Sequence, residues 1–119
     1  MSIALDVMAR DGYQCFRCGM ALAPGGRLSN CHHRLLKSGG VVIDGPQNRI
    51  TLCGFGNNLS DADGRELCHG WVHHHSTEAR ANGWIISRHA TQPPELIPVL
   101  HHRRGLVLLT VDYQIKDVA

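Results

Sequence analysis

The stretch Cys31-His32-His33-Arg34 places two adjacent histidines in a segment that is predicted to form a strand. A second strand-like run, Arg49-Ile50-Thr51-Leu52-Cys53, follows, and Asn48 stands directly before it. Further on, His69 and His73 are four residues apart, a spacing that puts two side chains on one face of a helix. The pattern therefore predicts two strands followed by a helix, with histidines on the first strand and on the helix.

Four cysteines surround this pattern. They form a Cys-x2-Cys pair and a more widely spaced pair: Cys15, Cys18, Cys53 and Cys68. Zinc is well served by four thiolates, and an all-cysteine site without an open position is structural. Unligated buried cysteine is the alternative interpretation, because free cysteine is a common core residue. Cys31, the fifth cysteine, is interpreted as a core thiol.

The histidine pair, the later asparagine, the His-x3-His spacing and the cysteine frame together resemble the HNH (ββα-metal) endonucleases. The resemblance covers roughly residues 10–88 and is to the subfamily with a structural zinc, typical of phage-encoded HNH proteins. It implies an α+β fold: a zinc-stapled ββα-metal (His-Me finger) core with an N-terminal helix. Residues 89–119 are then a β-rich C-terminal extension, and residues 1–119 form a single HNH nuclease domain.

The resemblance also implies roles for individual residues. His33 is the general base that takes a proton from the attacking water, and an imidazole with a pKa of about 6.5 suits that task. His32, His69 and His73 are ligands of the catalytic metal, and Asn48 orients the base or braces the loop that holds it. His32 and His33 serve one site only if the strand bends or ends there, because neighbours on a regular strand face opposite ways. The alternatives are a structural histidine at position 33, a solvated helix pair and an ordinary strand-entry asparagine.

The implied activity is metal-dependent hydrolysis of DNA phosphodiester bonds that leaves a 3′ hydroxyl. Its cofactors are one structural Zn²⁺ and one catalytic divalent metal, which is Mn²⁺, Co²⁺, Ni²⁺, Zn²⁺ or Mg²⁺. The expected partner is double-stranded DNA, and small phage HNH proteins suggest a role in DNA packaging with the terminase subunits. The expected DNA contacts are basic side chains: Arg34, Lys37, Arg103 and Arg104.

Two other functions stay open. One is a non-catalytic zinc-binding module that binds DNA or acts as an adaptor, and such a module needs neither histidine pair. The other is a histidine-rich metal-buffering protein, which does not predict Asn48 or the ordered spacing. The HNH interpretation is the one that uses all of these residues.

Composition and charge allow these interpretations without deciding between them. The chain has 119 residues, 43% hydrophobic and only 5% aromatic, so its core is modest and a metal would act as a staple. A net charge of +2 is too weak to indicate nucleic-acid binding by itself. The first residues lack a basic segment followed by an apolar one, and no run approaches the roughly 18 apolar residues of a membrane span. We therefore expect a cytoplasmic protein with reduced thiols, in the host cytoplasm if it is phage-encoded.

The remaining segments have weaker signals. Helices are expected over residues 3–10 and 69–75, with Ser76 capping a further helical turn; whether the last two are one helix or two stays open. The histidine strand is expected over residues 27–36, and three later strands over residues 84–88, 97–100 and 106–115. The polar, Gly-rich segment 54–67 is interpreted as a surface-loop insertion.

Overall fold

Two short antiparallel strands form the centre of the fold. The computed structural model describes residues 3–24, 28–36, 43–56 and 58–118, and in it β1 (Ser29–His33) pairs with β2 (Arg49–Cys53). The register sets His33 opposite Arg49. β1 is shorter than the strand expected over residues 27–36, and it ends at the second histidine. The predicted α+β class is confirmed.

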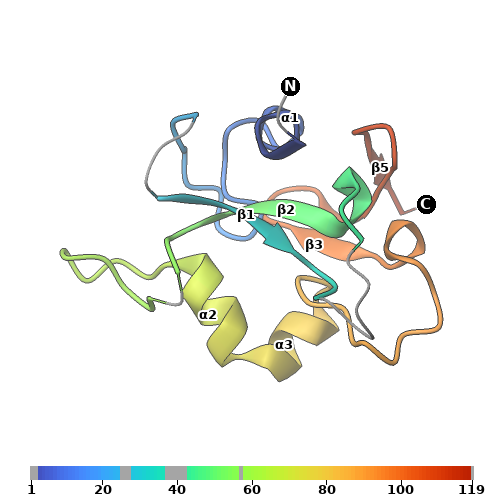
Figure 1. Ribbon diagram of the computed structural model, residues 1–119. Coiled ribbons are helices and arrows are strands. Elements are labelled where there is room, and N and C mark those ends of the chain that lie inside the picture. Colours follow the sequence, from blue (N-terminus) through green and yellow to red (C-terminus); the bar gives the residue numbers. More distant parts are fainter. Residues whose placement is uncertain (1–2, 25–27, 37–42, 57, 119) are drawn as a thin grey trace.

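Helices cover the two faces of this hairpin. α1 (Ile3–Arg10) lies above it in Figure 1, and α2 (Cys68–His74) lies below it. α1 buries Val7 and Met8 against the strands, whereas its N-terminal Ile3 is 36% exposed. The main core therefore lies between α1, the hairpin and α2.

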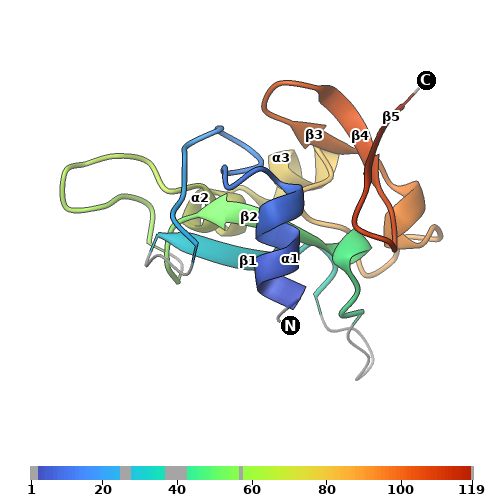
Figure 2. The same cartoon turned by 90° about the horizontal axis from the view of Figure 1, so that it is seen from above.

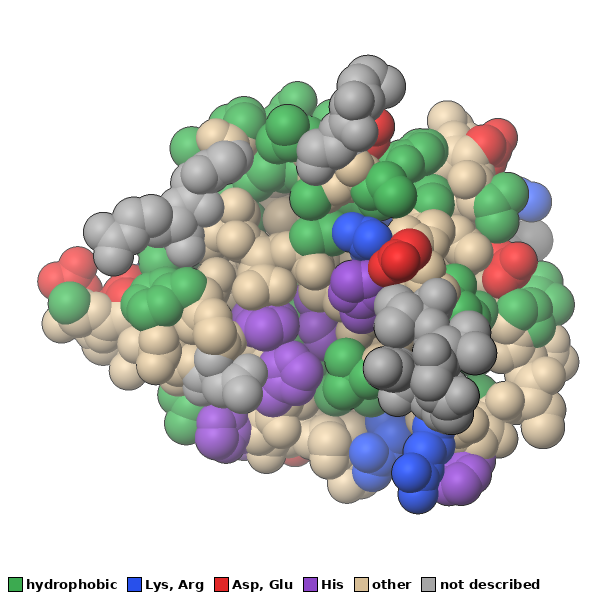
Figure 3. Space-filling view, in the orientation of Figure 1, with side chains coloured by type: hydrophobic (Ala, Val, Ile, Leu, Met, Phe, Trp, Pro, Cys, Tyr) green, Lys and Arg blue, Asp and Glu red, His purple; other side chains and the backbone are tan. Residues whose placement is uncertain are grey.

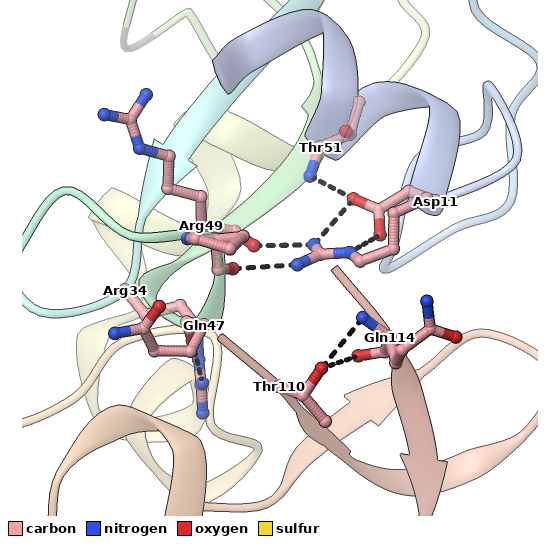
Figure 4. A network of polar contacts seen from close by, with 9 residues as sticks. Asp11, Arg34, Gln47, Arg49, Thr51, Thr110 and Gln114 are labelled. Carbon is pink, nitrogen blue, oxygen red and sulfur yellow. Dashed lines mark hydrogen bonds and ion pairs between the residues drawn. The ribbon is translucent and has the colours of Figure 1, made fainter. Parts of the chain in front are cut away.

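Charged side chains fasten the end of α1 to β2. The Asp11 carboxylate accepts a hydrogen bond of 2.9 Å from the backbone N–H of Thr51 (Figure 4). The neighbouring Arg10 donates to Asp11 and to the carbonyl oxygens of Pro46 and Arg49, the last two at 2.8 and 2.7 Å. Asp11 is only 4% exposed, and a buried carboxylate is tolerated when it is paired in this way. The network fixes where α1 ends relative to the sheet.

α3 (Ser76–Ala81) follows α2 directly, and the two are separate helices. The expectation that Ser76 caps the helix that follows α2 was wrong, because His75 occupies the N-cap position of α3. The ring of His75 stacks on Trp71 with 4.2 Å between centroids, and its Nδ1 lies 2.9 Å from the Trp71 carbonyl oxygen. The backbone N–H of His75 also donates to this carbonyl oxygen at 2.9 Å, so both contacts fix His75 at the end of α2.

A three-stranded antiparallel sheet forms the C-terminal part of the chain. It consists of β3 (Val99–His101), β4 (Gly105–Leu109) and β5 (Ile115–Asp117), and it follows the short 3-10 turn Pro94–Leu96. Figure 2 shows this sheet to one side of the β1–β2 hairpin. Its buried residues join the common core: Val99, Val107 and Leu109.

The strand expected over residues 84–88 does not form. The chain bends there, and the backbone N–H of Ile86 donates to the Arg34 carbonyl oxygen at 2.8 Å. Trp84 and Ile86 are each 5% exposed, and the Trp84 indole donates to the Leu100 carbonyl oxygen at 2.9 Å. The apolar run therefore reflects core packing, because a strand-like composition describes a half-buried surface more than a backbone preference.

The segment between β2 and α2 projects from the body at the left of Figure 1. Within it, Ser60 and Glu66 form an isolated antiparallel bridge, and the backbone N–H of Leu67 donates to the Leu59 carbonyl oxygen. Most of its described side chains are exposed, as expected for a surface loop. Among the described residues, no helix is long and apolar enough to cross a bilayer.

Candidate metal centres

Four cysteine sulfurs come together where three segments meet. Cys15 and Cys18 lie in the turn after α1, Cys53 ends β2 and Cys68 begins α2. The four sulfurs all lie within 4.8 Å of one another, and those of Cys18 and Cys53 are 3.8 Å apart. Two sulfurs that bind one zinc ion tetrahedrally at about 2.3 Å are about 3.8 Å apart. The four cysteines therefore form a site that could hold a structural zinc.

Glycine is required at position 19 of the cysteine turn. The backbone N–H of Gly19 donates to the Cys15 carbonyl oxygen at 2.9 Å, and Gly19 has a φ of +81°, a conformation that other residues rarely adopt. A Cβ on Gly19 would also lie 2.6 Å from the ring of His102. Tight closure of the turn and the approach of the C-terminal sheet both depend on this residue.

Arg17, inside the Cys-x2-Cys turn, places a positive charge at the sulfur cluster. Its Nη1 donates to Cys68 Sγ at 3.2 Å and to Glu66 Oε1 at 2.9 Å, and its guanidinium lies 3.8 Å from the centroid of the Trp71 ring. Four thiolates around one divalent ion carry excess negative charge, which a guanidinium offsets. The cysteine spacing does not predict this role, because it depends on where α2 packs.

Three histidines meet between β1 and α2. His32 is 1% exposed, and its ring lies edge-on to the rings of His69 and His73 at 5.3 and 5.4 Å between centroids. One ring nitrogen from each residue lies within 4.8 Å of the others, and the Nε2 atoms of His69 and His73 are 3.1 Å apart. Two nitrogens that bind one ion at about 2.1 Å are about 3.0–3.4 Å apart, so this spacing fits a shared ion. The structure thus brings the three expected ligands together, and Figure 3 shows histidine side chains gathered at the centre of one face.

Backbone carbonyls orient two of these rings. His32 Nε2 lies 2.7 Å from the Trp84 carbonyl oxygen, and His69 Nδ1 lies 2.6 Å from that of Gly56. A carbonyl oxygen only accepts, so each of these nitrogens carries the proton and the other ring nitrogen keeps its lone pair. A histidine that binds a metal is typically held in this way by its second nitrogen.

The protonation states also suit metal binding. Burial lowers the pKa of His32 to about 3, and the neighbouring rings of His69 and His73 add to the effect. Burial also lowers the pKa of His73, with His69 as a further cause. His32 and His73 are therefore neutral at neutral pH, as a metal ligand must be.

His33 and Asn48 make different contacts. His33 Nε2 lies 3.1 Å from Asp44 Oδ1, a partner that the sequence did not predict. Asn48 is fully buried; its Oδ1 accepts the Leu35 N–H at 2.7 Å, and its Nδ2 donates to the carbonyl oxygens of Leu35 and Ile43 at 3.0 and 2.8 Å. Asn48 thus ties the chain that leaves β1 to the chain that approaches β2.

The expected DNA contact by Arg34 was wrong. Arg34 is 0% exposed, and its guanidinium donates to four carbonyl oxygens at 2.7–3.2 Å: those of Gln47, Gly83, Pro94 and Ile97. Burial lowers its pKa to about 9, which still leaves it charged at neutral pH. Arg34 is therefore an internal brace that ties its own segment to three others, and Figure 4 shows it beside Gln47.

The other basic candidates are at the surface or outside the described residues. Lys37 lies outside the described residues, Arg103 is exposed, and Arg104 pairs with Asp117 at 2.9 Å. Sequence reasoning missed a surface cavity of about 510 Å³ whose walls carry further basic side chains beside Leu36: Arg80, Arg88 and His89. Only the folded chain brings α3 and the segment after Ile86 together at this cavity.

Comparison with known proteins does not assign a role to either of the two metal centres. No protein-family model, curated protein or solved structure matches this chain.

Proposed function

We propose that this chain is a metal-dependent DNA endonuclease of the HNH (ββα-metal) type, with a zinc-stapled core. The observation that carries the proposal is the convergence of one ring nitrogen from each of His32, His69 and His73, with backbone carbonyl oxygens orienting the rings of His32 and His69. His33 follows His32 at the end of the same strand, and Asn48 braces the chain around it. A buffering protein needs no such bracing, and an adaptor needs no cluster of neutral imidazoles.

In this proposal, His32, His69 and His73 hold a divalent ion. Such an ion stabilises the negative charge that develops on the phosphate and on the departing oxygen. His33 takes a proton from water, whose oxygen then forms the new bond to phosphorus. The bond from phosphorus to the 3′ oxygen breaks, and this oxygen takes a proton from solvent to become a 3′ hydroxyl.

The structural zinc would position the catalytic half of the site. Cys53 ends β2 and Cys68 begins α2, so one ion on the four thiolates would lock the strand to the helix. His69 directly follows Cys68 in the chain. A shift of this junction would therefore displace the ring of His69 from the cluster.

Double-stranded DNA is the proposed partner, and exposed basic side chains are the proposed phosphate contacts: Arg80, Arg88 and Arg103. Arg104 joins them only if it leaves its pair with Asp117. A role beside the terminase in phage DNA packaging, in the host cytoplasm, is the biological setting that we propose for this activity.

The experiment that tests the function is plasmid cleavage by the purified protein with Mn²⁺, Co²⁺, Ni²⁺ or Mg²⁺, and with EDTA as the control. We expect metal-dependent conversion of supercoiled plasmid and a loss of at least about a hundredfold in His33→Ala. His74→Ala is the control for the loss of a histidine, because His74 is exposed on α2 and lies outside the three-histidine cluster. DNA binding without cleavage by the wild-type protein would instead identify a non-catalytic DNA-binding module.

A further inference from the structure

His33 and Arg49 form a cross-strand pair that a third residue bridges. The two residues are directly opposite in the β1–β2 register, so their side chains leave the hairpin on the same face. Asp44 Oδ1 lies 3.1 Å from His33 Nε2 and also 3.1 Å from Arg49 Nη2. Arg49 Nε additionally donates to the backbone carbonyl oxygen of Asp44 at 2.9 Å.

Arg49 is the residue that makes the Asp44 carboxylate a fixed partner. The side chain of Asp44 is 65% exposed, and an exposed carboxylate–histidine contact is weak on its own. Arg49, whose side chain is 14% exposed, holds both the backbone and the carboxylate of Asp44. The carboxylate therefore has one preferred position beside His33.

A carboxylate fixes which nitrogen of an imidazole is available. An ionised carboxylate only accepts hydrogen bonds, so the neutral His33 ring carries its proton on Nε2 and keeps its lone pair on Nδ1. The same contact limits rotation of the ring about its side-chain bonds. A base that removes a proton from water needs both a free lone pair and a fixed direction.

We propose that Asp44 is the positioning residue of the general base: it holds His33 so that Nδ1 is the atom that accepts the proton from water. Arg49 holds Asp44 in turn. This inference rests on the proposed nuclease function, and it divides the role assigned to Asn48 between two residues. Asn48 braces the chain through backbone contacts, whereas Asp44 contacts the imidazole itself.

The test measures kcat and KM for plasmid nicking by Asp44→Asn, Asp44→Glu and Asp44→Ala. We expect kcat to fall by about 10- to 100-fold in the alanine variant, with KM nearly unchanged. Asn offers a weaker, neutral acceptor and should fall between alanine and wild type, whereas Glu restores the carboxylate and should recover part of the loss. Asp112→Asn, which removes an exposed aspartate in the turn before β5, is the matched control and should keep the wild-type kcat.

A double variant separates positioning from a general effect on the fold. If Asp44 acts through the ring, His33→Ala/Asp44→Ala should be no slower than His33→Ala alone. A full second loss in the double variant would assign Asp44 a structural role and overturn the inference. Wild-type kcat in Asp44→Ala, together with an inactive His33→Ala, would overturn the inference but leave the proposed function. An inactive wild-type protein, or a fully active His33→Ala, would overturn both.

Discussion

The Nε2 atoms of His69 and His73 lie 3.1 Å apart on successive turns of α2. The proton on His69 is held at Nδ1 by the Gly56 carbonyl oxygen, so the His69 Nε2 offers a lone pair to this contact. His73 Nε2 would give up the proton that it donates to this contact in order to bind an ion, and the three rings could then hold one divalent ion between them. Imidazole suits Mn²⁺, Co²⁺, Ni²⁺ and Zn²⁺, whereas Mg²⁺ prefers oxygen ligands and keeps its waters.

The first prediction is therefore a metal preference. Cleavage should be supported by Mn²⁺, Co²⁺ or Ni²⁺ at lower concentrations than by Mg²⁺. His73→Ala should raise the Mn²⁺ concentration for half-maximal cleavage by more than about tenfold, because a direct ligand matters at least as much as its supporting contacts. His69→Ala should abolish cleavage with every metal. Calorimetric titration with Mn²⁺ gives the same comparison without an activity assay.

His74→Ala is the control for this series. His74 neighbours His73 in the chain but is exposed and lies outside the three-histidine cluster. If His73→Ala and His74→Ala have equal effects on the titrations, only His32 and His69 bind the ion. The site would then have two protein ligands, and Mg²⁺ would become a suitable working ion.

The second prediction concerns the four cysteines. Metal analysis of the purified protein should give about one tightly held zinc per chain. Cys15→Ser or Cys68→Ser should remove the zinc and most of the cooperative thermal transition, because zinc binding contributes to the folding free energy of a small domain. Cys31→Ser should be mild, since Cys31 is only half-buried and its sulfur lies 3.8 Å from Arg49 Nη1. A wild-type protein that contains no zinc and still melts cooperatively would argue against a structural zinc at the four cysteines.

Local spacing explains what could be predicted from the sequence. The Cys-x2-Cys turn and the i,i+4 histidines are short-range patterns, and each already places its side chains near one point. The strand at Arg49–Cys53 and the helix at Ile3–Arg10 were predicted at their observed bounds. In each case the residues that define the element are neighbours in the chain.

Contacts between distant segments explain what could not be predicted. Arg34 resembles a DNA-binding residue in the sequence because it follows the histidine pair, but the carbonyl oxygens around it come from up to 63 residues away. Asp44 reaches His33 only because the strand register places His33 opposite Arg49. The apolar residues 84–88 suggest a strand, yet Trp84 is held by Leu100 from the C-terminal sheet. Nothing in the local pattern of these segments encodes their partners.

The third prediction tests Arg34 as an internal brace. Arg34→Lys should lower the free energy of unfolding by about 2–4 kcal/mol, because a lysine ammonium cannot reach four separate carbonyl oxygens and leaves buried acceptors unpaired. Arg103→Lys is the matched control at an exposed arginine and should leave the free energy of unfolding unchanged. Urea denaturation measures both. If the Arg34→Lys variant is as stable as the wild type but binds DNA more weakly, Arg34 contacts DNA and is not an internal brace.

The fourth prediction is a pH dependence of stability that His101 contributes. His101 is 7% exposed, and its Nδ1 accepts the backbone N–H groups of Arg103 and Arg104 at 3.1 and 3.2 Å. A nitrogen that accepts these bonds cannot carry a proton, so the folded protein favours the neutral ring. Burial lowers the pKa of His101 to about 4, and the neighbouring His102, Arg104 and Arg103 side chains act in the same direction.

The sign follows from the unfolded chain, in which a histidine has a pKa of about 6.5. Between pH values of about 6.5 and 4 the unfolded state binds more protons at this residue, so the free energy of unfolding falls as the pH is lowered through that window. His101→Gln keeps an acceptor oxygen but cannot titrate, so its free energy of unfolding should fall less steeply over the same range. His32, whose pKa burial lowers to about 3, leaves some pH dependence of the same sign in both proteins. Urea denaturation at several pH values from 7 to about 4.5 measures the difference, and parallel curves for the two proteins would mean that His101 is not held neutral in the fold.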